Sequence, residues 1–204
     1  MDGISTTMVD VVYPISGERL PRDHRQALAD ALENVLPGVT AWPGLGVHRV
    51  NVVAGNGINA LLSQRARLTL RVRRGQLAAM APLDHARLHV GGHALQLGRA
   101  QVRELVPHGT LYSHLVTTDD DDELEFQAAV ERELEAMGVR ARPICGHQHV
   151  VAIGGEGCFT GFSLMLDGLS PADSVQVLES GLGGHRRLGC GVFVAHRSAA
   201  AVRT

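Results

Sequence analysis

The stretch that decides the fold is GLGGHRRLGCG at positions 181–191, which leads into the apolar run VFV at 192–194. Five of its eleven residues are glycine, and its centre carries the basic run HRR at 185–187. Glycine allows backbone dihedrals that other residues avoid, so a freely shaped main chain surrounds a cluster of positive donors. This combination suits a polyanion, although a plain helix-to-strand connection explains the composition equally well.

The stretch does not match the common nucleotide-binding loops. A Walker A loop ends in Gly-Lys-Ser/Thr, and the dinucleotide fingerprint needs a third glycine where Arg186 stands. The stretch also follows a segment expected to be helical (170–180) and precedes one expected to be extended, which reverses the strand-loop-helix order of those motifs. Neither kind of nucleotide binding is therefore expected.

The same stretch carries a resemblance to a known family. It resembles the C-terminal glycine-rich signature of the CRISPR-associated repeat RNA-processing endoribonucleases of the RAMP superfamily, in particular the branch found in myxobacterial-type class 1 systems. The matching residues are Gly181, Leu182, Gly183, Gly184, Arg186, Gly189, Cys190, Gly191 and Phe193. A DHxxAL segment at 23–28 and an arginine-rich strand at 65–73 agree as well. Non-catalytic RAMP subunits can carry related loops, so the signature is more specific for the superfamily than for the nuclease.

Charge is unevenly distributed along the 204 residues. All 19 basic residues are arginine, and the net charge is -2. The segment 119–135 holds nine of the 21 acids and one arginine, Arg132, so the rest of the chain has a net charge of +6. An acidic region beside a basic one fits RNA binding on the basic side. Only 3% of residues are aromatic, so phosphate and sugar contacts are expected rather than extensive base stacking.

The remaining composition indicates an ordinary globular protein. With 45% hydrophobic residues the chain can bury a core, as one domain or two small ones. Its cysteines, Cys145, Cys158 and Cys190, are widely separated and predict neither a disulfide framework nor a zinc site. The sequence shows no signal peptide and no apolar run long enough to span a membrane, so we expect a cytoplasmic protein.

The first helix is expected between Pro21, which can occupy its first turn, and Gly38, which closes it. Its apolar stripe consists of Leu28, Ala31, Leu32, Val35 and Leu36. His24 lies at the N-terminal end of that stripe, and its spacing alone favours a half-buried structural histidine. The family resemblance instead implies a catalytic histidine, because such nucleases commonly place one in or just before the first helix, facing the glycine-rich loop.

Residues 65–73 alternate between apolar and polar types. Leucine or valine stands at 68, 70 and 72, and the intervening residues are Arg65, Arg67, Thr69, Arg71 and Arg73. A period of two predicts a strand with four arginines on one face. RNA phosphates can neutralise such a row, and an edge strand protected by charge against aggregation is an equally good explanation.

The order of expected elements indicates the fold class. In the first half we expect strands at 9–13, 48–53, 65–73 and 85–93, and helices at 21–36 and 76–80. In the second half we expect strands at 111–117, 150–153, 158–166 and 189–195, and helices at 123–137 and 170–180. Each half has the strand-helix-strand-strand-helix-strand order of the ferredoxin-like arrangement. The prediction is an α+β fold of tandem ferredoxin-like (RRM-like) domains, 1–100 and 110–204, as the RAMP resemblance also implies.

Histidine spacing gives little support for a metal site. On one strand His85, His89 and His93 would stand about 13 Å apart, too far to share an ion. His147 and His149 can chelate metal as a pair on a strand, but no third ligand lies nearby in sequence. No metal and no other cofactor is expected.

The resemblance implies a chemistry in which the ribose 2'-hydroxyl attacks the adjacent phosphate and leaves a cyclic phosphate. His24 is the expected general base, or the acid in the alternative assignment. Family members often add a tyrosine, serine or lysine. Because this chain has no lysine, the second catalytic role is either absent or passes to another residue, for which Tyr13 and His48 are the candidates. The residues expected to bind RNA are Arg22, Arg25, Arg65, Arg67, Gly183, Gly184, His185, Arg186 and Arg187.

Three functions follow as hypotheses. The first is a metal-independent endoribonuclease that cuts precursor CRISPR RNA within its repeats, reading a stem and its flanking single strand through shape and backbone. The second is a non-catalytic RAMP subunit that holds guide RNA in an effector complex, with other subunits as partners. The third is a metallohydrolase that uses the histidines.

Overall fold

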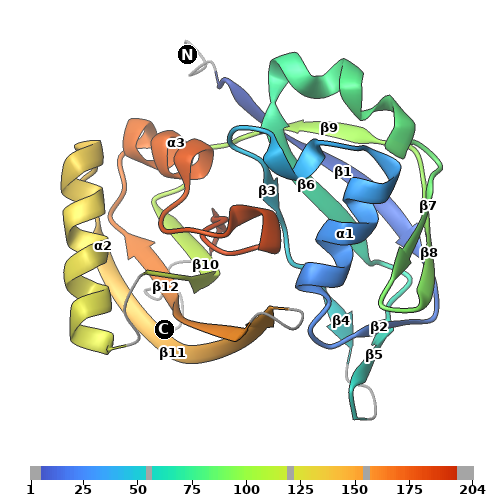
Figure 1. The fold of residues 1–204 in the computed structure, drawn as a ribbon. Coiled ribbons are helices and arrows are strands. Elements are labelled where there is room, and N and C mark those ends of the chain that lie inside the picture. Colours follow the sequence, from blue (N-terminus) through green and yellow to red (C-terminus); the bar gives the residue numbers. More distant parts are fainter. Residues whose placement is uncertain (1–5, 54–56, 119–121, 154–156, 197–204) are drawn as a thin grey trace, which may run out of the picture. The chain divides into compact units, whose positions relative to one another are not determined.

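The computed structural model describes residues 6–53, 57–118, 122–153 and 157–196 (Figure 1). Its contacts divide the chain into two compact units. The N-terminal unit consists of Thr7–Glu104 together with Arg187–Gly189, and the C-terminal unit consists of Leu105–Arg186 and the residues around it, Met1–Thr6 and Cys190–Thr204. These units group residues by contact, so the expected domain bounds of 1–100 and 110–204 stay a prediction.

The N-terminal unit is built on an antiparallel sheet with the strand order β3-β6-β1-β8-β7, in which β9 also pairs with β1. A smaller sheet has the order β2-β5-β4. The elements, with η for a 3₁₀ helix, are β1 (Met8–Ser16), β2 (Arg19–Pro21), α1 (Arg25–Val35), η1 (Val39–Ala41), β3 (Gly46–Val47), β4 (Val52–Val53), β5 (Asn59–Leu62), β6 (Arg67–Arg73), η2 (Arg74–Leu83), β7 (Arg87–Val90), β8 (His93–Leu97) and β9 (Gln101–Glu104).

The core of this unit lies between the main sheet and α1 (Figure 1). Val9, Val11 and Tyr13 alternate along β1 and are buried in one cluster with Leu28 and Leu32 of α1. Each buried aliphatic side chain contributes about 1.5–3 kcal/mol relative to its exposed state. The packing therefore fixes α1, and with it the residues at the N-terminal end of the helix.

The start of α1 differs from the sequence prediction. Pro21 is not in the first helical turn but ends β2, where it pairs with Asn59 of β5. His24 is the N-cap residue, and its carbonyl oxygen accepts the first helical hydrogen bond from the Leu28 N–H. The helix is therefore shorter than expected at this end, because the proline serves a strand.

The C-terminal unit has a four-stranded antiparallel sheet of order β11-β12-β10-β13. Its elements are β10 (Thr110–Val116), α2 (Glu123–Met137), β11 (Arg142–Ile153), β12 (Gly157–Asp167), α3 (Pro171–Ser180), η3 (Arg186–Leu188), which begins in this unit and ends in the other, and β13 (Val194–Ala195). Figure 1 shows α2 lying along β11 and β12. The rings of Phe126 on α2 and Phe162 on β12 are 4.7 Å apart at their centroids.

The α+β, tandem ferredoxin-like fold class is confirmed. The C-terminal unit has the order β10-α2-β11-β12-α3-β13. The N-terminal unit contains the same order with added short elements, among them the strands of the smaller sheet, and with the 3₁₀ helix η2 in place of the second α-helix. The helices expected at 123–137 and 170–180 are confirmed: Asp122 caps α2, Gly138 ends it in the left-handed region, and Ser170 caps α3.

Several expected strands were wrong in extent. Of the strand expected at 48–53 only β4 forms, and β3 lies just before it at 46–47, while the strand expected at 189–195 is reduced to β13. The segment with three histidines is a hairpin, β7 and β8, that turns at Gly91 and Gly92, both of which have positive φ. Glycine explains the last two differences, because Gly189 and Gly191 before β13, like Gly91 and Gly92 in the hairpin, have positive φ. Within the described ranges, no helix has the length and apolar character needed to cross a membrane.

Candidate functional site

His24 is held at the N-terminal end of α1 in a defined orientation. Its Nδ1 lies 3.0 Å from the carbonyl oxygen of Pro21, and the residue is 3% exposed. A carbonyl oxygen only accepts hydrogen bonds, so Nδ1 carries the proton of the pair. In the neutral ring Nε2 then bears the free lone pair, which is the form that a general base requires.

The surroundings of His24 favour that neutral form. Burial lowers the pKa of His24, the hydrogen bond to Pro21 partly opposes this, and the positive charges of Arg25 and Arg49 lower the pKa further. The nearby carboxylate of Asp23 acts in the opposite direction. Because the net shift is downward, the ring is predominantly neutral at pH 7.

The tip of the glycine-rich stretch, Arg187–Gly189, lies beside the start of α1. Arg25 Nη1 donates to the carbonyl oxygens of Leu188 at 3.0 Å and Gly189 at 3.4 Å, and these residues belong to the same unit as α1. A Cβ at Gly189 would lie 2.9 Å from the Val47 carbonyl oxygen and 3.2 Å from Arg25 Nη1. Gly189 also has φ +79°, so only glycine fits this close approach.

The exposed basic residues of the N-terminal unit have different settings. Arg22 is exposed, and its Nε donates to the Gly57 carbonyl oxygen at 2.7 Å. Arg65 and Arg67 are exposed at the start of β6, where Arg67 Nη1 donates to the Ala66 carbonyl oxygen. Arg187 is exposed in the tip. These arginines are placed where solvent, and hence a phosphate, can reach them.

The row of four arginines expected on β6 does not exist as a row. Arg71 is 2% exposed and forms two hydrogen bonds with Asp10 on β1, Nε to Oδ1 at 2.8 Å and Nη2 to Oδ2 at 3.0 Å. Its counter-ion is therefore a carboxylate of the same unit, and Arg71 is removed from the candidate phosphate-binding face.

His48 belongs to this buried ion pair. Its Nε2 lies 3.4 Å from Asp10 Oδ1, longer than a normal hydrogen bond, so the contact is electrostatic. Burial alone would raise the pKa of Asp10, but the contacts with His48 and Arg71 outweigh burial and hold this pKa well below its usual range. Asp10 alternates along β1 with the core residues Val9 and Val11, so the cluster lies on the sheet face opposite the core and α1. The structure does not bring His48 together with His24.

Tyr13 lies in the hydrophobic core of the N-terminal unit. The residue is 0% exposed, and its hydroxyl has no hydrogen-bond partner among the described residues. Burial, with the Asp84 carboxylate as a lesser cause, raises the pKa of Tyr13. With its pKa raised, the Tyr13 phenol stays protonated at neutral pH and is poorly suited to act as a base.

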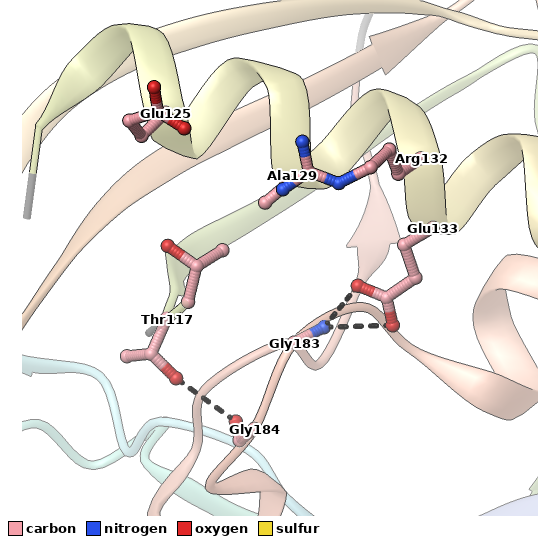
Figure 2. Close-up of a pocket in the computed structure, with 8 residues that line it drawn as sticks. Thr117, Glu125, Ala129, Arg132, Glu133, Gly183 and Gly184 are labelled. Atoms are coloured by element: carbon pink, nitrogen blue, oxygen red, sulfur yellow. Dashed lines mark hydrogen bonds between the residues drawn. The ribbon is translucent and has the colours of Figure 1, made fainter. Parts of the chain in front are cut away.

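The base of the glycine-rich stretch is bound by its own unit. Figure 2 shows the Gly183 N–H directed at the carboxylate of Glu133 on α2, at 3.1 and 2.9 Å from the two oxygens. A Cβ at Gly183 would lie 2.2 Å from the Thr117 carbonyl oxygen, and its φ is +68°. A pocket of about 400 Å³ lies between α2 and this segment, lined among others by Arg132, Glu133 and Gly184. The backbone amide expected to meet an RNA phosphate thus already holds a carboxylate.

Two further loop residues make contacts within the C-terminal unit. The ring of His185 stacks on Phe159, with centroids 4.6 Å apart, and its Nδ1 is 3.2 Å from Thr117 Oγ1. Arg186 Nη1 donates to the carbonyl oxygens of Glu179 and Ser180, at the end of α3. Arg186 therefore caps a helix C-terminus, where a positive charge and donors satisfy the last carbonyl groups.

The histidines once considered for metal binding are dispersed. His93 is 3.2 Å from Asn59, and the ring of His149 packs against that of His114 with centroids 4.5 Å apart. Over the part of the chain that the structure describes, no three histidine, cysteine or acidic side chains form a group that could hold an ion.

Sequence reasoning missed two residues of this region. Arg49 is near enough to lower the pKa of His24, and the Glu133 carboxylate accepts the hydrogen bond from the Gly183 N–H. Arg49 follows His48 directly, but no motif marked it. Glu133 belongs to a run of acidic residues whose pattern indicates a solvent-exposed helix face, so nothing distinguished it from its neighbours.

Comparisons with known proteins agree on one family. The Cas6 family model, described as Cas6 Crispr, matches residues 9–198. A CRISPR-associated endonuclease Cas6 from Myxococcus xanthus (strain DK1622) is 36% identical over 197 residues, which cover 96% of this chain and 85% of that protein.

Solved structures share the fold at low sequence identity. A CRISPR associated protein Cas6 has a TM-score of 0.70 at 10% identity, covering 93% of this chain and all of that one. A Thermus thermophilus Cse3, solved bound to an RNA representing a pre-cleavage complex, has a TM-score of 0.53 at 15% identity, covering 92% of this chain and 98% of that one.

Proposed function

Because the chain belongs to the Cas6 family, we propose that it is a cytoplasmic endoribonuclease that cuts precursor CRISPR RNA within its repeats to give mature guide RNA. The relative from Myxococcus xanthus, which is named an endonuclease, supports the activity. The substrate we infer is a repeat stem with its flanking single strand, read through shape and backbone.

The reaction we propose needs no metal ion. Nε2 of neutral His24 removes the proton from the ribose 2'-hydroxyl next to the scissile phosphate. The 2'-oxygen then attacks phosphorus in line, the bond to the 5'-oxygen breaks, and the products are a 2',3'-cyclic phosphate and a 5'-hydroxyl. The departing oxygen takes its proton from solvent.

One observation carries this proposal: the hydrogen bond between His24 Nδ1 and the Pro21 carbonyl oxygen. It orients the ring and leaves Nε2 as the basic nitrogen, while burial and nearby arginines keep the ring neutral. The contact between Arg25 and the loop tip supports the site, because it brings Leu188 and Gly189 to the same end of α1.

Phosphate binding is assigned to the exposed arginines of the N-terminal unit. Arg22, Arg65, Arg67 and Arg187 present exposed guanidinium groups, which bind phosphate through a planar donor fork. Arg25, Gly183, Gly184, His185 and Arg186 were expected to join them. Their contacts with the protein suit shaping the loop, and their part in RNA binding remains a prediction.

A cleavage assay in excess EDTA tests the proposal. The purified protein is incubated with a repeat RNA from its own CRISPR locus, and with the same RNA carrying a single 2'-deoxy nucleotide before the scissile phosphate. We expect cleavage of the first RNA, a cyclic phosphate on its product, and no cleavage of the second. Activity that EDTA abolishes, or that the deoxy substitution spares, would indicate a metallohydrolase instead.

A non-catalytic RAMP subunit that binds guide RNA, together with other effector subunits, is the second candidate. The burial of His24, at 3% exposure, favours it, because a base must reach its substrate. This protein would bind the repeat RNA in EDTA and leave it intact.

A further inference from the structure

We propose that Arg49 contacts the non-bridging oxygens of the scissile phosphate and stabilises the charge that develops there during cleavage. The inference rests on the proposed endoribonuclease function and assigns a catalytic residue to it. Sequence reasoning had given the second catalytic role to Tyr13 or His48, but the structure buries Tyr13 in the core and sets His48 against Asp10.

Arg49 lies where the start of α1, the loop tip and the chain after β3 meet. A Cβ at Gly189 would be 3.9 Å from the backbone nitrogen of Arg49, 2.9 Å from the carbonyl oxygen of Val47 and 3.2 Å from Nη1 of Arg25. Arg25 follows His24 directly in the chain. The residues 47–49 therefore border the same small region of the N-terminal unit as the proposed base.

The electrostatic coupling of the two side chains agrees with this placement. Three charged groups influence the pKa of His24: Arg25 and Arg49 lower it, and Asp23 raises it. Asp23 and Arg25 are immediate chain neighbours of His24, whereas Arg49 is brought there by the fold. Arg49 is exposed, so its guanidinium can meet a substrate that arrives from solvent.

Three other arginines of the N-terminal unit make contacts within the protein. Arg25 Nη1 is engaged by the carbonyl oxygens of Leu188 and Gly189, and its Nε lies 4.0 Å from an Asp23 carboxylate oxygen. Arg22 Nε donates to Gly57. Arg71 is buried against Asp10. Of the two arginines whose charge lowers the pKa of His24, Arg25 is half-buried and Arg49 is exposed, so Arg49 is the one that a phosphate next to the imidazole can reach.

The chemistry asks for such a group. As the 2'-oxygen bonds to phosphorus and the bond to the 5'-oxygen breaks, negative charge grows on the non-bridging oxygens. A guanidinium stays protonated throughout, so Arg49 neither gives nor takes a proton. Its effect is electrostatic, and loss of one comparable donor costs about 10²–10³-fold in rate.

The test measures single-turnover cleavage of the repeat RNA, with protein in excess and EDTA present. Arg49→Ala should slow cleavage by about a hundredfold or more, while the Kd for a non-cleavable 2'-deoxy RNA changes by only a few fold. Arg49→Lys should recover part of the rate. Arg99→Ala removes another exposed arginine of the same unit, one that is not among the charges that shift the pKa of His24, so it serves as the matched control and should cleave like the unmodified protein.

Two readouts separate direct contact from a merely structural effect. Sulfur in place of one non-bridging oxygen should slow the unmodified protein, and Arg49→Ala should lose most of that sensitivity because the contact is already gone. The acidic limb of the pH–rate profile should also move to higher pH in Arg49→Ala, since a positive charge that lowers the pKa of His24 has been removed.

The results that overturn the inference are distinct from those that overturn the function. An unmodified protein that binds the repeat RNA and never cuts it refutes both. If the unmodified protein cuts the RNA, then an Arg49→Ala protein that cuts as fast as Arg99→Ala, loses only affinity, or keeps the full sulfur effect refutes the role of Arg49 alone. Thermal unfolding midpoints equal to that of the unmodified protein exclude misfolding, and Arg49→Gln is a second neutral variant.

Discussion

The two compact units carry opposite charges. The sequence of the N-terminal unit has 13 arginines and seven acids, a net charge of +6, whereas that of the C-terminal unit has six arginines and 14 acids, a net charge of -8. The overall charge of -2 conceals this segregation. The unit that contains the proposed base is therefore also the unit suited to attract a polyanion.

The contrast extends to the adjacent residues Arg186 and Arg187. Arg186 belongs to the acidic unit and donates to carbonyl oxygens of Glu179 and Ser180, whereas Arg187 belongs to the basic unit and is exposed. One glycine-rich stretch thus supplies a structural cation to one unit and an accessible cation to the other. Residue type alone does not reveal which is which.

If proton transfer belongs to the basic unit, His24→Ala gives the largest effect. We expect single-turnover cleavage to fall by about a thousandfold, because general base catalysis contributes about 10²–10⁴-fold, with RNA affinity largely kept. Rapid-quench cleavage and filter binding measure the two quantities. Unchanged cleavage by a folded His24→Ala protein would remove His24 from the mechanism and leave the charge contrast without a catalytic meaning.

The basic unit also depends on one of its few acids. Asp10→Ala leaves Arg71 buried without its carboxylate, and we expect a loss of about 3 kcal/mol in the free energy of unfolding, the lower end for a broken buried pair since the Asp10 side chain is 19% exposed. Urea unfolding at pH 7 measures this.

The pH dependence gives a second check on Asp10. Its pKa is depressed in the folded protein, so its contribution is present above the unfolded pKa of about 4 and is lost as the pH falls below that value. The difference in stability between the unmodified protein and Asp10→Ala should therefore shrink below about pH 4. A difference that grows there would show that the ion pair does not stabilise the unit.

In the acidic unit the loop glycines should act through packing. Gly183→Ala places a methyl group 2.2 Å from the Thr117 carbonyl oxygen at a positive φ, so we expect a loss of about 2 kcal/mol. Gly184→Ala is the matched control, because the nearest atom to its Cβ is 3.8 Å away, and it should change stability by about 0.5 kcal/mol or less. Equal midpoints in differential scanning calorimetry would contradict the tight packing of this segment.

The pair Arg186→Ala and Arg187→Ala gives the smallest effect and the sharpest contrast. Arg187→Ala should weaken RNA binding and reduce the salt slope by about one unit, with no loss of stability. Arg186→Ala should instead lower the free energy of unfolding by about 1 kcal/mol, because the carbonyl groups at the C-terminal end of α3 lose their donor. Salt titrations of RNA affinity and urea curves on both variants would reveal a reversed assignment at once.

The sequence was most informative about the C-terminal unit. There Gly138 and Ser170 are local signals whose effect depends only on neighbouring residues, and α2 and α3 were predicted to within a residue of their observed bounds. The fold class followed from the order of elements. In the N-terminal unit, Pro21 ends a strand and does not begin the helix. The reason is its pairing with Asn59, which is distant in sequence and therefore leaves no local signal.

The candidate site was predictable only in its individual residue types. Alternation along β6 predicts that Arg71 and Arg67 lie on the same face of the strand. It cannot show that Asp10, on the paired strand β1, is the counter-ion of Arg71. It also cannot show that His48 faces away from α1. Arg49 became visible only when folding brought it to His24. Long-range contacts of this kind leave no local pattern.

The N-terminal unit is discontinuous in sequence, because it includes Arg187–Gly189, which follow the two helices of the C-terminal unit. A polypeptide that stops at Glu104 would lack the carbonyl groups to which Arg25 donates. If the coding sequence were split between the two halves, the first fragment would therefore lack the residues that contact the N-terminal end of α1. A circular permutant that keeps 187–189 attached to both flanking segments would preserve that contact.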